Sequence, residues 1–378
     1  MASSLSPVEP LTTRGVHTGM ILAIVLVSYF MVVLDNSIIF TGLPQIRAGL
    51  GLSPTGLAWA QNAYTLVFGG LLLLGARLGD LLGRRRVFIV GLALFGLASF
   101  LVGVAQNAAW IVTARAFQGI GAAIVAPSSL ALITALFPAG HERTRATAAY
   151  GTTAGLGASL GLVVGGALAS WVSWRAGFFI NVPVAVVMVI LALRFLPSFE
   201  TERGRFDLIG AATSVLGMGA LVYSIINAGE SGWGDPFAIW PMTIGALVLA
   251  LFMLNEWRAR QPILPLRLFA SAGRSGAAIA RLLFAGTMIA FYFFTTQYFQ
   301  GVYGWTPLQA GLVNTAHQLG STLGVAVLTS VAAGASTLSG RVVDAYAGGV
   351  VMIAVAVIAS LALIVPSEVR SRRMTTPA

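Results

Sequence analysis

The chain has 378 residues, of which 57% are hydrophobic and only 9% are charged, and its mean hydropathy is +0.88. Soluble domains carry roughly 25% charged residues, so this composition excludes an ordinary soluble protein and predicts an all-helical polytopic membrane protein. The formal net charge is +10. Because the basic residues lie mostly in short loops, we interpret them as topology determinants and expect no nucleic-acid partner.

Residue types that are missing exclude several kinds of chemistry. All 22 basic residues are Arg, so the chain has no phosphate-loop lysine and no lysine for Schiff-base chemistry. The absence of Cys removes disulfides, thiolate metal sites and Cys nucleophiles. No catalytic triad, carboxylate pair or metal-ligand constellation lies inside the apolar runs. We therefore predict no enzymatic activity, no cofactor and no metal.

Eleven apolar runs have about the length that crosses a bilayer. They lie near 20–43, 57–77, 86–105, 109–137, 146–170, 176–196, 207–229, 237–256, 276–300, 308–333 and 343–365. The connections after even-numbered runs carry most of the Arg residues, which predicts a cytoplasmic N-terminus. Eleven spans would place the basic tail with Arg370, Arg372 and Arg373 outside, which the same rule disfavours. Either one run is not a full span or spans are missing.

The connection between the second and third runs is short and rich in Arg. Residues 75–86 read GARLGDLLGRRR. The glycines allow a tight turn and a close approach of helices, the acid can cap a helix or pair with an Arg, and the Arg cluster favours the cytoplasmic side. An ordinary basic loop is the alternative. The residues of interest are Gly75, Asp80, Gly83, Arg84 and Arg85.

The first run contains one acidic residue, Asp35, within LDNSIIFTGLP. An ionised carboxylate near the bilayer centre costs roughly 2.5–3.5 kcal/mol on insertion scales, so Asp35 should face the bundle interior or a wet cavity. Since protonation removes the charge, such a carboxyl is suited to taking up and releasing protons. The alternative is a structural Asp bonded to Asn36 and a neighbouring helix.

Two further runs carry patterned residues. In the fourth run, Arg115 and Gln118 share one helical face with small residues, so the guanidinium needs packed acceptors; the alternative is an Arg that snorkels to the membrane interface. In the fifth run, glycines recur every four residues and form a stripe that lets helix backbones touch. We call Gly157, Gly161, Gly165 and Gly166 the glycine stripe.

These segments resemble the major facilitator superfamily, and in particular its fourteen-span drug:proton antiporter branch. Residues 75–86 resemble the signature loop between the second and third helices of the superfamily. The segment LDNSIIFTGLP resembles the branch motif L-D-x-[TS]-I-[VI]-x-x-x-L-P, and ARAFQGIGAA resembles R-x-x-Q-G-x-G-A-A. The glycine stripe resembles G-x-x-x-G-P-x-x-G-G, with Leu162 at the proline position. SWRAGFFINVPV matches W-R-x-x-F-x-I-N-x-P.

The C-terminal half departs from that branch. VNTAHQLGSTLGVAVL at 313–328 resembles its thirteenth helix, with His317 where Arg is usual, and follows directly on text that resembles the tenth. About three spans are therefore absent relative to the branch. His317 is interpreted as a structural, neutral imidazole, with a proton relay as the alternative.

The resemblance implies five regions. These are a cytoplasmic tail at 1–19, a six-helix bundle at 20–196, two extra linker helices with a cytoplasmic connection at 197–275, an incomplete C-terminal bundle at 276–366, and a basic tail at 367–378.

It also implies proton-coupled efflux by alternating access, in which two bundles rock about a midplane cavity. A proton at Asp35 would displace a lipophilic, cationic compound, Arg115 and Gln118 would adjust proton binding, the 75–86 loop would act as a latch, and the glycine stripe would carry the moving contact. Residues that could line the cavity are Tyr292, Tyr298, Gln300, Asn314 and His317.

Two alternatives remain at this stage. One is a metabolite exporter on the same scaffold, and the other is a transport-inactive membrane protein with an internal deletion. We expect a monomer in a bacterial cytoplasmic membrane, with a small lipophilic substrate, protons and the lipid bilayer as its partners.

Overall fold

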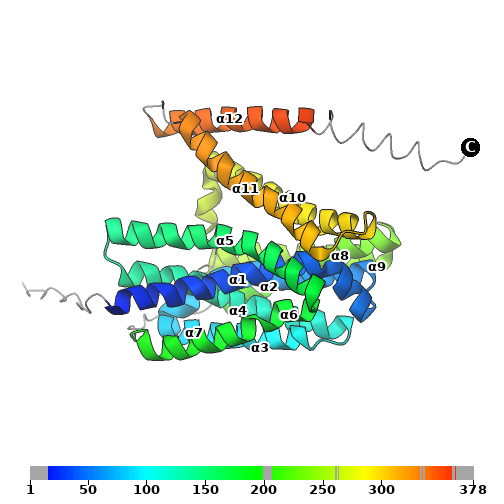
Figure 1. Cartoon of the computed structure of the whole chain (residues 1–378), viewed down its shortest axis with the longest axis horizontal. Helices are drawn as coiled ribbons and strands as arrows, with labels where there is room; N and C mark the ends of the chain where they lie inside the picture. The colour runs from blue at the N-terminus through cyan, green and yellow to red at the C-terminus, as the bar shows by residue number, and fades with distance from the viewer. Residues whose placement is uncertain are drawn as a thin grey trace, which may run out of the picture. The chain divides into compact units, whose positions relative to one another are not determined.

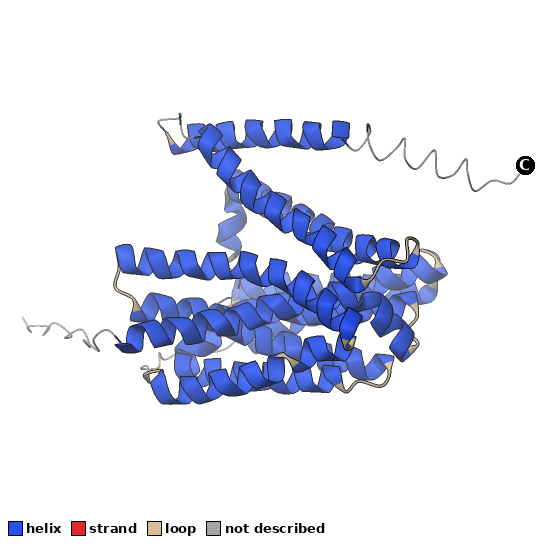
Figure 2. Ribbon diagram, in the orientation of Figure 1, coloured by secondary structure: helices blue, strands red, loops and turns tan. Residues whose placement is uncertain are grey.

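The computed structural model describes residues 16–198, 207–259, 262, 264–332, 334, 337–359 and 362 (Figure 1). Within these residues all regular structure is helical (Figure 2). The elements are α1 (Val16–Leu50), α2 (Pro54–Leu82), α3 (Arg84–Gly103), α4 (Ala108–Leu136), α5 (His141–Trp171), α6 (Trp174–Phe179), α7 (Asn181–Phe195), α8 (Leu208–Ser231), α9 (Pro236–Arg258), the 3₁₀ helix η1 (Leu266–Ala270), α10 (Ala272–Gly301), α11 (Pro307–Ala332) and α12 (Leu338–Ala359).

Each predicted run falls on a helix, which confirms the all-helical fold class. Of the helices in the described part of the chain, nine are long and apolar enough to cross a membrane, with α6 and α7 counted together as Trp174–Phe195. The tenth and eleventh runs fall on α11 and α12, and α12 contains the apolar stretch Val343–Val355. The main difference at the ends is in α1, which begins at Val16 and continues to Leu50.

The sixth run differs from the continuous helix predicted at 176–196. The structure divides it at Ile180 into α6 and α7. Pro183 lies three positions beyond this break and has no N–H to donate to the carbonyl of Phe179, so the regular i to i−4 pattern is interrupted there. The break places Asn181 at the start of α7.

Local sequence signals explain where other helices begin. The Ser53 hydroxyl accepts a hydrogen bond from the Gly56 amide at 3.0 Å and caps α2, and Asn107 caps α4 through the Trp110 amide at 2.9 Å. Side chains that cap the first N–H groups stabilise a helix start because those groups lack partners in the helix.

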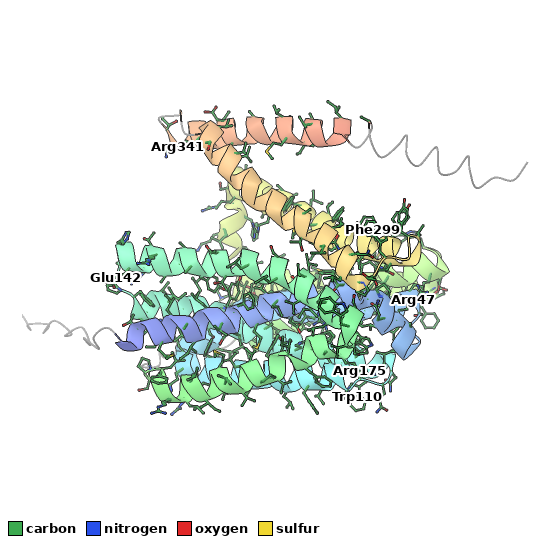
Figure 3. All side chains as sticks on the ribbon, in the orientation of Figure 1. Arg47, Trp110, Glu142, Arg175, Phe299 and Arg341 are labelled. Atoms are coloured by element: carbon green, nitrogen blue, oxygen red, sulfur yellow. The ribbon has the colours of Figure 1, made fainter. Side chains whose placement is uncertain are left out.

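The chain forms two compact units, Met1–Thr315 and Ala316–Ala378. In the first unit α2 and α3 both pack along α4, α1 packs along α5, and α8 packs along α9. Trp110 and Arg175 lie at one end of this bundle and Glu142 lies at the opposite end (Figure 3). Arg175 donates to the Gly103 carbonyl at 2.7 Å. In the second unit, Gly348 lies beside Leu328.

The core of the first unit consists of two apolar clusters. The first cluster contains Val32, Tyr64, Phe95, Ala122 and Ala185, and the second contains Ile39, Ala60, Val102, Ala114 and Phe178, each with further members. The helices α1, α2, α3, α4 and α5 contribute to both clusters, so the two clusters are stacked along the helix axes, and α10 contributes Tyr292 to the second cluster alone.

Candidate functional site

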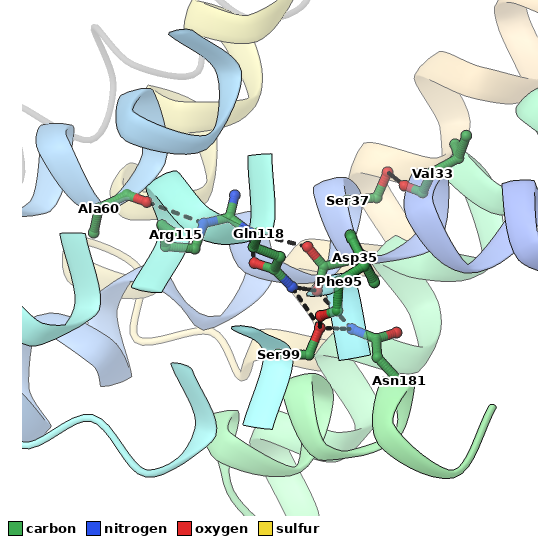
Figure 4. A network of polar contacts seen from close by, with 9 residues as sticks. All are labelled: Val33, Asp35, Ser37, Ala60, Phe95, Ser99, Arg115, Gln118 and Asn181. Carbon is green, nitrogen blue, oxygen red and sulfur yellow. Dashed lines mark hydrogen bonds and ion pairs between the residues drawn. The ribbon is translucent and has the colours of Figure 1, made fainter. Parts of the chain in front are cut away.

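A buried ion pair joins α1 to α4. The Arg115 Nη1 atom lies 2.9 Å from the Asp35 Oδ2 atom, and both side chains have an exposed fraction of 0% (Figure 4). Charges removed from water in this way persist when they are paired and hydrogen-bonded. Both residues were predicted individually, and the fold brings them into direct contact across 80 residues of sequence.

Three more polar side chains complete this arrangement. Gln118 Nε2 donates to Asp35 Oδ1 at 2.9 Å and to Ser99 Oγ at 2.7 Å, and its Oε1 accepts from Arg115 Nη1 at 2.7 Å. Asn181 Nδ2 donates to the same Asp35 oxygen at 2.7 Å (Figure 4). We call Asp35, Ser99, Arg115, Gln118 and Asn181 the polar layer. It accounts for both carboxylate oxygens with donors from two other helices.

The guanidinium of Arg115 also contacts α2. Its Nε atom donates to the Ala60 carbonyl at 3.2 Å, and its central carbon lies 4.3 Å from the centre of the Tyr64 ring. Such a placement over an aromatic face is favourable for a desolvated cation. These contacts exclude the alternative in which Arg115 snorkels to an interface, since the side chain is fully buried.

The polar layer lies between the two apolar clusters. In α1, Asp35 stands between Val32 of the first cluster and Ile39 of the second. In α4, which runs the other way, Gln118 stands between Ala114 of the second cluster and Ala122 of the first. The reversal of order follows the helix direction, so the polar residues share one depth in the bundle.

The polar layer contains one acid, Asp35, and one cation, Arg115. Asp35 is the one carboxylate it contains, and among the residues that the structure describes no group of three or more His, Asp or Glu could hold a metal ion. A single buried carboxylate held by a cation and two amides can bind either a proton or a positively charged group, each of which would change its pairing.

The loop predicted at 75–86 is a direct junction between two helices. Asp80 lies in the last turn of α2, Gly83 adopts a φ of 94°, and Arg84 begins α3. Arg84 Nη2 lies 3.1 Å from Asp80 Oδ1, with side chains 28% and 27% exposed. The predicted pairing is therefore present, whereas the capping alternative is not, because Gly83 is the N-cap of α3 and no side chain caps it.

The same junction is tied to two other helices. Arg84 Nη1 donates to the Ala131 carbonyl of α4 at 3.3 Å, and Arg85 Nη2 donates to the Leu193 carbonyl of α7. The two Arg side chains thereby connect the α2–α3 junction to the ends of neighbouring helices.

Gly75 serves a close approach of backbones. A Cβ atom at this position would meet the Ala123 carbonyl oxygen of α4. Pro127 in α4 lacks the N–H that would otherwise bind this carbonyl. The carbonyl that Pro127 leaves unpaired within α4 therefore faces α2, and only a glycine leaves room for it.

The glycine stripe packs against the segment of α1 that carries Asp35. A Cβ at Gly161 would lie 2.7 Å from the Leu34 carbonyl oxygen, and one at Gly165 would lie 2.8 Å from the Ile38 Cα. Gly166 faces α11 instead, where Pro307 O would be 2.7 Å away. These distances are shorter than ordinary carbon contacts, so the stripe permits the backbone contact of α5 with α1 and α11 that its spacing indicates.

Two of the predicted cavity residues, Tyr292 and Gln300, lie on α10 and contact neighbouring residues of α1. Tyr292 is buried against Phe40, with ring centroids 5.5 Å apart, and Asn314 donates to Thr296 at 2.8 Å. Gln300 donates to the Thr41 carbonyl at 2.9 Å. Tyr298 lines an open hollow together with Pro54 and other α10 residues. The side chain of His317 lies outside the described residues.

Ser99, Asn181 and Gln61 were not among the predicted site residues. Ser99 and Asn181 belong to the polar layer, and Gln61 is 1% exposed in α2 beside Ala60. Each is a polar side chain in an otherwise apolar run, and polar groups inside spans are unfavourable unless they have a role. This signal could have identified them, although it would not have indicated their partners.

Comparisons with known proteins agree with this architecture. Residues 25–374 match the family model described as Major Facilitator Superfamily. A puromycin resistance protein of Streptomyces alboniger is 39% identical over 311 residues, which are 82% of this chain and 61% of that protein. A cephamycin export protein of Amycolatopsis lactamdurans is 38% identical over 311 residues, which are 81% of this chain and 64% of that protein. The chain thus spans less than two thirds of the length of these relatives.

Solved structures show a similar fold. A peptide transporter in complex with sulfate has a TM-score of 0.56 at 14% identity, and the match covers 86% of this chain and 69% of the peptide transporter. A proton:xylose symporter of the same superfamily has a TM-score of 0.50 at 14% identity, and the match covers 84% of this chain and 72% of the symporter. These two matches show a shared all-helical fold.

Proposed function

The chain belongs to the major facilitator superfamily, and from this premise we propose that it exports small lipophilic, cationic molecules across the bacterial cytoplasmic membrane in exchange for protons. The names of two relatives, a resistance protein and an export protein, support efflux as the direction of transport. The proposed partners are the substrate, protons and the bilayer, with the chain acting as a monomer.

The observation that carries this proposal is the complete burial of Asp35 in direct contact with Arg115. A proton on Asp35 would remove one charge of the pair and release Arg115 from it. A cationic substrate would instead compete with Arg115 for the carboxylate. Because both events act on the same oxygens, binding of one disfavours binding of the other, which is the requirement for exchange.

The other predicted elements have roles in the same cycle. We propose that the Asp80–Arg84 junction acts as a latch between conformations, since its partly exposed pair loses little free energy when it opens. We propose that the α1–α5 contact at the glycine stripe moves as a unit, because close backbone packing is either fully made or lost. The basic connections support a cytoplasmic N-terminus.

Efflux from cells does not separate coupling from expression, so the test uses everted membrane vesicles. Vesicles containing the full chain should accumulate ethidium when a proton gradient is imposed, and the Asp35→Asn variant should not. Glu142→Gln is the matched control, because Glu142 is an exposed acid at the end of the bundle and should retain accumulation. Variant amounts are compared by immunoblot.

Two results would contradict the proposal. Gradient-driven accumulation that persists in Asp35→Asn would remove Asp35 from coupling. No accumulation by the wild-type chain at equal expression, with several dyes, would favour the transport-inactive alternative.

A further inference from the structure

One buried amide next to the polar layer has no hydrogen-bond partner among the residues that the structure describes. Gln61 is 1% exposed, and neither its Nε2 nor its Oε1 is paired there. Buried amides are nearly always hydrogen-bonded, because an unpaired one has lost its contacts with water and gained none. An unmatched donor and acceptor at this depth therefore require an explanation.

The position of Gln61 relates it to Arg115. Its neighbour Ala60 accepts a hydrogen bond from Arg115 Nε at 3.2 Å. Tyr64, three residues further on the same helical face, lies under the guanidinium at 4.3 Å. Ala60 belongs to the second apolar cluster and Tyr64 to the first, so Gln61 lies at the same depth as the polar layer.

Arg115 has an unmatched donor as well. Its Nε and Nη1 atoms are used by Ala60, Asp35 and Gln118, but Nη2 is buried with no partner in the described part of the chain. Figure 4 shows this nitrogen outside the dashed network. A guanidinium can only donate hydrogen bonds, so whatever meets Nη2 must supply an acceptor.

We infer that the Gln61 amide and Arg115 Nη2 form the polar recognition point for the cargo, and that the cargo is a lipophilic molecule bearing an acceptor oxygen such as a carbonyl, ester or ether. This inference rests on the proposed function and adds a second requirement to it. Asp35 selects charge, while Gln61 and Arg115 Nη2 select an oxygen. The surrounding apolar clusters favour the lipophilic remainder of the molecule.

The physical basis for selectivity is the burial of Gln61 and Arg115. A site whose buried polar groups pair with a substrate oxygen discriminates against analogues that lack this oxygen, because the groups are then left unpaired. At an exposed site water would pair with the unmatched groups, so the difference in affinity between the two kinds of molecule would be largely lost. Because Gln61 and Arg115 are both buried, a rearrangement of the surrounding helices is required for access.

The test measures equilibrium binding of two dyes to the purified full chain. Rhodamine 6G is a lipophilic cation with ester and ether oxygens, and tetraphenylphosphonium is a lipophilic cation with neither. The variant Gln61→Met keeps the length of the side chain and removes its hydrogen bonding. Gln106→Met makes the same chemical change at an exposed loop residue and is the matched control.

Gln61→Met should weaken rhodamine 6G binding about 3- to 10-fold relative to tetraphenylphosphonium, the range of one neutral hydrogen bond. Gln106→Met should leave the ratio of the two dissociation constants unchanged. Gln61→Met should also keep or raise the melting temperature, because it removes an unpaired buried amide. A merely structural Gln61 would instead lower it.

The inference is overturned if Gln61→Met changes the dissociation constants of both dyes by the same factor or leaves both unaltered. It is also overturned if Gln61→Met lowers the melting temperature, or if the wild-type chain binds neither dye. Its failure is distinguishable from failure of the proposed function. If Gln61→Met leaves the ratio of the two dissociation constants unchanged while efflux still depends on Asp35, only the inference is overturned. If Gln61→Met changes this ratio but the wild-type chain shows no efflux, only the proposed coupling is overturned.

Discussion

The chain contains two Asp–Arg pairs with the same chemistry and opposite surroundings. Asp35 and Arg115 lie 2.9 Å apart with no exposed side-chain surface, and one amide from α4 and one from α7 support them. Asp80 and Arg84 lie 3.1 Å apart, are four residues apart in sequence, and are more than a quarter exposed. Distance alone would make the two pairs equivalent.

The difference lies in what happens when one partner changes. An exposed pair exchanges its contact for water, so breaking it is nearly neutral. In a buried pair, loss of one partner leaves an uncompensated charge in a low-dielectric interior. The buried pair is therefore suited to make proton binding and conformation depend on each other, while the exposed pair is suited to open and close repeatedly.

The largest expected effect is from removal of the buried cation. Arg115→Met should lower the free energy of unfolding by about 3–5 kcal/mol, because Asp35 would remain charged and buried. Thermal or denaturant unfolding of the purified protein in micelles measures this change. Adding Asp35→Asn to Arg115→Met should restore a large part of the loss. If the Arg115→Met protein is as stable as the wild type, the buried pair does not differ from the exposed pair as described.

A medium effect is expected where the glycine stripe supports the α1 segment that carries Asp35. Gly161→Ala would place a Cβ 2.7 Å from the Leu34 carbonyl oxygen and should destabilise the protein by about 1–3 kcal/mol. Gly155→Ala, on the same helix with nothing within 4 Å of the added atom, should be neutral or slightly stabilising. Equal melting temperatures for the two variants would contradict this packing.

The smallest effect is expected at the exposed pair. Asp80→Asn should change the free energy of unfolding by less than about 1 kcal/mol, and added salt should reduce even that difference. If the junction is a latch, Asp80→Asn should reduce dye accumulation clearly while it leaves the melting temperature almost unchanged. The comparison of melting temperature with dye accumulation separates the two, and a loss of several kcal/mol would show that the exposed pair is structural.

Local patterns in the sequence were sufficient to predict the helices. Apolar runs of membrane length correspond to the helices because both depend on residues close in sequence. The division at Ile180 was missed because the expectation weighed hydropathy and not the missing N–H of Pro183. The pairing of Asp80 with an Arg of the cluster was predicted because both lie in the same short connection.

The site was predictable in its members but not in its pairing. Asp35, Arg115 and Gln118 stood out as polar groups within spans, whereas their bonds to Ser99 and Asn181 depend on how distant helices meet. Tyr292, Gln300 and Asn314 were grouped as cavity residues from their resemblance alone. In the structure Tyr292 and Gln300 of α10 contact Phe40 and Thr41 of α1, and Asn314 of α11 donates to Thr296 of α10.

Exchange at Asp35 is tested most directly by proton release on substrate binding. Tetraphenylphosphonium is added to the purified full chain in weakly buffered solution, near the pH at which the wild type releases most protons, and the pH change is recorded. The account predicts release of up to about one proton per bound cation from the wild type and none from Asp35→Asn. Equal proton release from the two proteins, at equal occupancy, would contradict it.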